Sequence, residues 1–129
     1  MKAGELISYI AAVRGTEFPP EVYDTWLNEV EGLVKTRIHL VPDESVVPLV
    51  RDADDPDAFN ETVLSAPFPY DKLYAPYIEA KADFAAGEYE RYQNSMAMFE
   101  TYFTEYMAHY AQVNRPADRR KRAALGIEF

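Results

Sequence analysis

Apolar residues recur every three or four positions near the end of the chain, and this pattern predicts a long helix. The stripe consists of Tyr89, Tyr92, Met96, Phe99, Phe103, Tyr106, Tyr110 and Val113. Spacings of three and four residues place side chains on one face of a helix. Because no Gly or Pro lies between Gly87 and Pro116, we expect one uninterrupted helix, roughly 37 Å long given the rise per residue of an α-helix.

The stripe has the seven-residue repeat of a coiled coil, but its composition favours packing inside its own domain. Tyr fills half of the stripe, and the flanking positions lack the complementary charges of a two-stranded coiled coil. Met98, Tyr102 and Met107 lie beside the stripe and make the helix apolar on more than one side. We predict that these three residues contact a neighbouring subunit or partner, since a small monomer would not fully cover them.

Three further helices follow from the same periodicity. One covers residues 4–13 and ends at Gly15, the second runs from Pro20 to Ile38, and the third runs from Tyr70 to Ala86. Gly87 separates the third helix from the long one by a tight turn, which predicts an antiparallel αα-hairpin. Gly32, inside the second helix, is expected to permit a close helix crossing. The polar face of that helix is predicted to consist of Asp24, Asn28, Glu31 and Lys35.

Residues 39–69 interrupt the helical pattern. They contain five prolines, which break long helices, and two short β-prone runs at 46–50 and 62–64 around an acidic stretch. We expect a short β or irregular insertion here. The predicted fold is therefore all-α, with about four helices in a single domain at 1–114 and a basic C-terminal tail at 115–129.

The charge is divided unevenly between the domain and the tail. Residues 1–114 hold 8 Lys and Arg against 20 Asp and Glu, a net charge of −12, whereas residues 115–129 hold 5 against 2, a net charge of +3. The acidic domain argues against a broad or sequence-specific nucleic-acid surface, which needs clustered cations. The tail is interpreted either as a solvated terminus or as an arm that docks on an acidic neighbour. Its candidate contacts are Arg119, Arg120, Lys121, Arg122 and Phe129, with Ile127 as a second apolar anchor.

The chain lacks the residue patterns of the common catalytic and metal sites. It has no Cys, its two histidines are not preceded by Glu at the spacing of a di-metal bundle, and it has no Gly-x-Ser-x-Gly or Gly-rich phosphate loop. Glu105 and His109 are interpreted as an ordinary helix-surface pair. The acidic residues at 52–61 lack the Gly and Glu positions of a calcium loop. We predict no enzymatic activity, no cofactor, no signal peptide and no membrane span.

Two stretches resemble small head and packaging proteins of tailed phages and prophages of Gram-positive bacteria. The first is Trp26-Leu-Asn-Glu-Val-Glu-Gly32, and the second runs from Ala66-Pro-Phe-Pro-Tyr70 through Asp83 to Met96-Ala-Met-Phe99. That group is similar to the head–tail connector, or adaptor, family of long-tailed phages. The resemblance implies a non-enzymatic virion protein that forms a homo-oligomeric ring beneath the portal and contacts portal and tail-completion proteins. It also implies a place in the host cytoplasm during assembly and then in the virion. The alternative is a bacterial helical adaptor domain that binds a protein partner without forming a ring.

Overall fold

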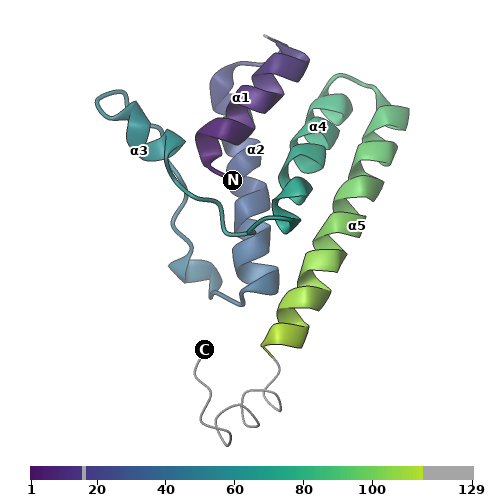
Figure 1. Cartoon of the computed structure of the whole chain (residues 1–129). Coiled ribbons are helices and arrows are strands. Elements are labelled where there is room, and N and C mark those ends of the chain that lie inside the picture. Colours follow the sequence, from purple (N-terminus) through teal and green to yellow (C-terminus); the bar gives the residue numbers. More distant parts are fainter. Residues whose placement is uncertain (16, 115–129) are drawn as a thin grey trace, which may run out of the picture.

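The computed structural model describes residues 1–15 and 17–114 of the chain, and this part is mostly helical and has no β-strand, which confirms the predicted all-α class. It contains five α-helices, joined by shorter helical turns (Figure 1). In chain order the elements are α1 (Ala3–Arg14), α2 (Pro20–Leu33), the π-helical turn η1 (Val34–Ile38), the 3-10 turn η2 (Asp43–Ser45), α3 (Pro56–Asn60), the 3-10 turn η3 (Tyr70–Leu73), α4 (Tyr74–Ala85) and α5 (Tyr89–Val113).

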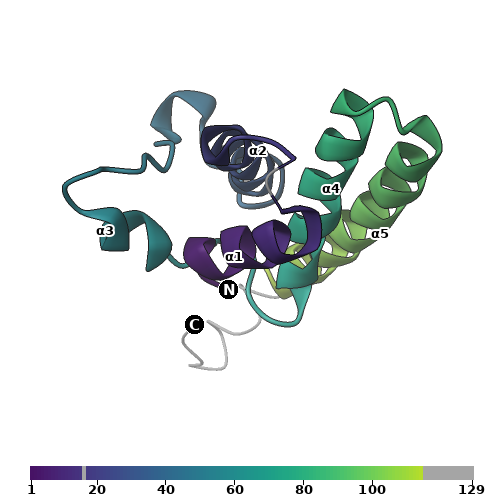
Figure 2. The ribbon, with the colours of Figure 1, turned by 90° about the horizontal axis from the view of Figure 1, so that it is seen from above.

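Helices α4 and α5 lie side by side and run in opposite directions (Figures 1 and 2). Gly87 makes the turn between them with a φ of 77°, a left-handed conformation that glycine adopts without strain. The apolar stripe of α5 faces α4, and the Tyr77 ring packs edge-on against Phe99 with centroids 4.9 Å apart. The stripe is buried most deeply at Phe99 and Tyr106.

Helices α1 and α2 pack on the other side of α4, so α4 lies between α2 and α5 (Figure 2). The core forms where the apolar faces of these helices meet, with fully buried side chains at Leu6, Ile10, Leu27, Val30, Val34, Leu73, Tyr74 and Ile78. Gly15 ends α1 with a φ of 62° and a hydrogen bond from its N–H to the carbonyl oxygen of Ala11. The second predicted helix matches α2 and η1 together, from Pro20 to Ile38.

Of the two predicted alternatives for the insertion, the described residues show the irregular one, with a 3-10 turn, a short helix and no β-strand. The β-prone run at 46–50 has no neighbouring strand to complete a ladder, and its one anchored residue, Leu49, is held instead by a side chain of α2. Residues 62–64 make only one isolated bridge, between Val63 and Lys2. The acidic stretch continues into a fifth helix, α3, because Pro56 occupies a first-turn position where its missing N–H costs nothing.

The close approach predicted at Gly32 is wrong, because a Cβ added there would meet no atom within 4 Å. The close approach occurs at Gly4, where a Cβ would lie 2.9 Å from the Cβ of Asn60. Gly4 therefore lets α1 pack directly against the end of α3. A glycine near the start of a short helix carries no periodic signal, and this contact was missed for that reason.

Candidate functional site

The long helix α5 exposes methionine on two separate sides. The Met98 side chain is 48% exposed and that of Met107 is 37% exposed. They are nine residues apart, which places them roughly 180° apart around the helix axis at the angular spacing of an α-helix. Met98 and Met107 therefore belong to two different surfaces and cannot form one contact patch.

Tyr102, the third predicted contact on α5, is covered in part by its own chain. The Nζ atom of Lys72 lies 4.7 Å from the centroid of the Tyr102 ring, a cation–π arrangement. The same Nζ lies 3.3 Å from a carboxylate oxygen of Glu105. Tyr102 also packs against the core, so it offers a partner less surface than Met98, which lies one turn before it on the same side.

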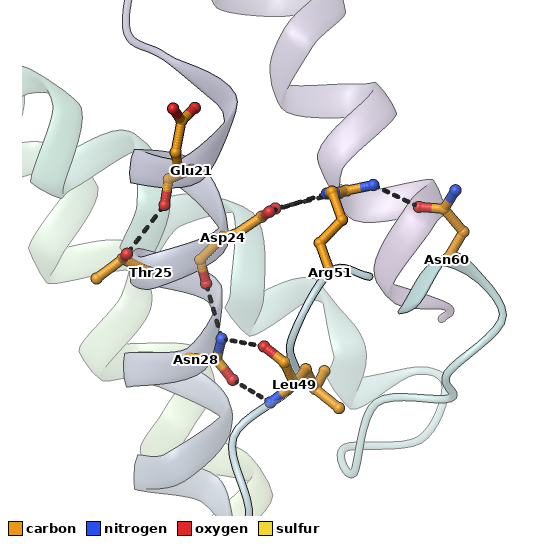
Figure 3. Close-up of polar contacts among 7 residues, drawn as sticks. All are labelled: Glu21, Asp24, Thr25, Asn28, Leu49, Arg51 and Asn60. Carbon is orange, nitrogen blue, oxygen red and sulfur yellow. Dashed lines mark hydrogen bonds and ion pairs between the residues drawn. The ribbon is translucent and has the colours of Figure 1, made fainter. Parts of the chain in front are cut away.

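The polar face of α2 holds the insertion in place (Figure 3). The Asn28 side chain donates to the Leu49 carbonyl oxygen at 2.8 Å and accepts from the Leu49 N–H at 2.7 Å, the pair of bonds that a neighbouring strand would make. Arg51 pairs with Asp24, Nε to Oδ2 at 2.9 Å, and this hydrogen bond raises the pKa of the guanidinium. The Arg51 guanidinium carbon also lies 4.2 Å from the centroid of the Phe59 ring.

Glu31, predicted to face solvent, is buried with only 4% of its surface exposed. Its carboxylate accepts hydrogen bonds from the Tyr74 hydroxyl at 2.8 Å, from the Ser65 N–H at 2.9 Å and from the Ser65 hydroxyl at 3.0 Å. The Tyr74 oxygen accepts in turn from the Ala66 N–H at 2.8 Å. Burial raises the pKa of Tyr74 far above its ordinary value. This network fixes α2, the end of the insertion and α4 to one another.

An aromatic cluster joins the end of η1 to the last turns of α5. The Nε2 atom of His39 lies 2.6 Å from the Tyr106 hydroxyl, and the His39 ring stacks on Tyr110 at a centroid distance of 4.7 Å. Tyr70 stacks on both Tyr106 and His109. Burial lowers the pKa of His39, which favours the neutral imidazole. The cluster therefore fixes the position of the C-terminal end of α5.

A polar cleft of about 470 Å³ lies between the end of α1 and the facing parts of α4 and α5. Arg14 lines the cleft and pairs with Asp83, Nη2 to Oδ1 at 2.9 Å, with the two side chains 12% and 4% exposed. Arg14 also pairs with Glu17, and burial raises the pKa of the neighbouring Glu79. The Arg14–Asp83 pair therefore holds α1 against α4.

Among residues 1–15 and 17–114, no group of three or more His, Asp or Glu side chains is placed to hold a metal ion. In the acidic stretch, Asp52 accepts a hydrogen bond from the Asp54 N–H, which shapes a turn, and Glu61 pairs with Lys2 at 2.6 Å. Within the same residues, no helix is long and apolar enough to cross a membrane.

The predicted contacts in the tail, Arg119, Arg120, Lys121, Arg122 and Phe129, lie outside the described residues. The sequence matches no protein-family model, and no curated protein or solved structure matches it. The candidate functional surfaces are therefore those that the geometry itself supplies: the two sides of α5, and the insertion anchored on α2.

Proposed function

We propose that this protein is a head–tail connector of a tailed phage or prophage, acting without catalysis as one subunit of a ring below the portal. The class comes from the resemblance of residues 26–32 and 66–99 to that group. The observation that carries the ring is the presence of exposed apolar side chains on opposite sides of α5. Portal and tail-completion proteins are the proposed partners, first in the host cytoplasm and then in the virion.

A ring is built from heterologous contacts, in which one surface of each subunit meets a different surface of the next. Met98 on one side of α5 and Met107 on the other supply one residue to each of two such surfaces. A two-fold dimer needs only one self-complementary patch, and it would leave the opposite side of α5 exposed. The arrangement on α5 therefore favours a ring over a dimer.

The charge of the domain is consistent with a protein that surrounds DNA without gripping it. The net charge of −12 over residues 1–114 gives phosphates few cationic partners. Several of the few cations are also engaged: Arg14, Arg51, Lys72 and Lys81 each form an ion pair within the chain.

The proposal is tested by imaging the protein alone and mixed with a purified portal protein. We expect rings, by negative-stain electron microscopy, in the mixture and at high protein concentration. A protein that stays monomeric by light scattering at high concentration, and forms no ring on the portal, would overturn the proposal. Terminase, portal and capsid genes beside this one would support it independently.

The second candidate is a helical adaptor that binds a protein partner without forming a ring. The insertion favours it, because Leu40, Val47 and Val50 are each at least 74% exposed there. Exposed apolar residues on a segment held to α2 suit the capture of a partner protein. Tight binding to a single neighbouring gene product, with one copy of each chain and no ring, would select this candidate.

A further inference from the structure

An apolar groove lies between α1 and α2, away from the surfaces of α5 described above. Its volume is about 390 Å³, within the size range of pockets that take small apolar groups. Phe18 fixes its wall, because its ring packs edge-on against Trp26 with centroids 5.3 Å apart and against Tyr23 at 6.1 Å. The lining is formed by Ile7, Ala11, Phe18, Pro19, Pro20 and Tyr23. The groove is therefore preformed and almost free of polar groups.

We propose that this groove receives the apolar residues of segment 115–129, Leu125, Ile127 and Phe129, from a second copy of the chain. The inference deepens the proposed ring and rests on it. The segment suits an apolar groove on an acidic protein, because its apolar residues follow a cluster of five cations that begins at Arg115. The domain that carries the groove has a net charge of −12, and opposite charges favour this encounter.

An acidic residue lies next to the groove lining in the sequence. Glu21 follows the lining residue Pro20, and its carboxylate forms no ion pair with the described residues. Figure 3 shows that carboxylate directed away from Asp24 and Arg51. The Glu21 carboxylate is therefore available to a basic segment that arrives from outside.

The path of the chain favours a second copy over the chain's own groove. Helix α5 ends at the opposite end of the molecule, beside His39, which stacks on Tyr110 (Figure 1). The groove at Pro20 lies about 27 Å away along α2 and η1. The end of α5 and the groove therefore lie at opposite ends of the axis formed by α2 and η1.

The 13 residue steps from Asn114 to Ile127 can span at most about 45 Å. Reaching its own groove would therefore use more than half of that length to travel the axis of α2 and η1. A neighbouring subunit imposes no such requirement. Because each copy would give one segment and receive another, the contact is heterologous, as a ring requires.

Disulfide trapping tests this inference cleanly because the chain has no cysteine of its own. Full-length chains carrying Ala11→Cys are mixed with chains carrying Phe129→Cys and oxidised, and the products are separated without reductant. Ala12→Cys is the matched control, since Ala12 is an exposed alanine on the same helix that does not line the groove. We expect the Ala11–Phe129 mixed dimer to exceed the Ala12–Phe129 dimer at least ten-fold, and added salt to reduce its yield.

Equal yields from the groove and control positions would overturn the inference. The inference would also be overturned if a chain carrying both Ala11→Cys and Phe129→Cys formed only the disulfide within one chain and none between chains. Electron microscopy of the same samples separates this result from the proposed function. Rings without the Ala11–Phe129 cross-link would support the connector proposal and refute the docking of the segment. The cross-link without rings would support the docking and refute the connector proposal.

Discussion

The buried network around Glu31 gives the sharpest test of how the fold is held together. In Tyr74→Phe, Glu31 loses a hydrogen-bond donor and the buried Ala66 N–H loses its acceptor. A hydrogen bond to a charged group contributes about 1.5–3 kcal/mol, and leaving a buried donor unpaired costs about 1–3 kcal/mol. We therefore expect Tyr74→Phe to lower the free energy of unfolding by about 4 kcal/mol.

Tyr77→Phe is a matched control within the same helix. The Tyr77 hydroxyl also donates to a glutamate of α2, Glu29, at 3.0 Å, but this pair is exposed to solvent. Its loss should cost about 0.5–1 kcal/mol, because water replaces the missing partner. The two variants thus remove the same atom from the same residue type and differ in burial.

Urea denaturation followed by circular dichroism measures both changes, and thermal melts provide a second readout. At about 3–4 °C per kcal/mol for a chain of this size, Tyr74→Phe should lower the Tm by roughly 12–16 °C. The Tyr77→Phe change should lower the Tm by no more than about 4 °C. Equal losses in the two variants would refute the reasoning, since burial of the Glu31 network would then contribute nothing.

Three further predictions concern packing, pH and assembly. Gly4→Ala should lower the free energy of unfolding by about 1–3 kcal/mol, because the added methyl group would overlap α3. Gly32→Ala should raise the free energy of unfolding by up to about 1 kcal/mol, because the added methyl group meets open space on a helix. Urea titrations in which both variants change stability in the same direction would contradict the packing at Gly4. For His39, burial places the folded-state pKa below the ordinary value of 6.5, so the unfolded chain binds the extra proton first. The free energy of unfolding should then fall as pH is lowered through 6.5, and His39→Asn should remove that part of the pH dependence. If stability measured from pH 7.5 to 5.5 changes with the same slope in His39→Asn as in the unmodified chain, the role of His39 is refuted. Met98→Asp and Met107→Asp should each change the free energy of unfolding by less than about 0.5 kcal/mol, and each should reduce self-association measured by light scattering. If both variants assemble as the unmodified chain does, the sides of α5 are excluded as subunit contacts.

The helical part of the fold could be predicted from local pattern alone. The apolar stripes predict α2 and α5, and two glycines, Gly15 and Gly87, predict where α1 and α4 end. The second helix was predicted with its observed bounds, because amphipathic periodicity continues through η1 to Ile38. Such features depend on neighbours within one or two turns, and a single sequence contains them.

The insertion could not be predicted in the same way. Its path depends on Asn28, Asp24 and Glu31, which local periodicity places on a solvent-facing side of α2. Residues 40–66 then fold over that side and bury Glu31, a contact across more than 30 positions of the sequence. A strand-forming tendency at 46–50 is also overruled here, because no second strand is present among the described residues to pair with it.

The candidate surfaces were predicted in part. The exposure of Met98 and Met107 followed from their positions beside the stripe, but their separation onto opposite sides needed the helix geometry to be considered as a whole. The partial covering of Tyr102 depends on Lys72, which belongs to another element. The groove between α1 and α2 had no signal in the sequence, because its lining comes from two helices and the prolines that connect them.

The anchoring of the insertion by side chains has a practical consequence. Residues 40–55 include no fully buried side chain, and Asn28 and Asp24 hold them to α2 at only two positions. The turn at 52–55 therefore contributes little to the core and tolerates added sequence. An epitope or a small fluorescent domain placed between Ala53 and Asp54 would mark every subunit of an assembly while leaving the helical frame intact.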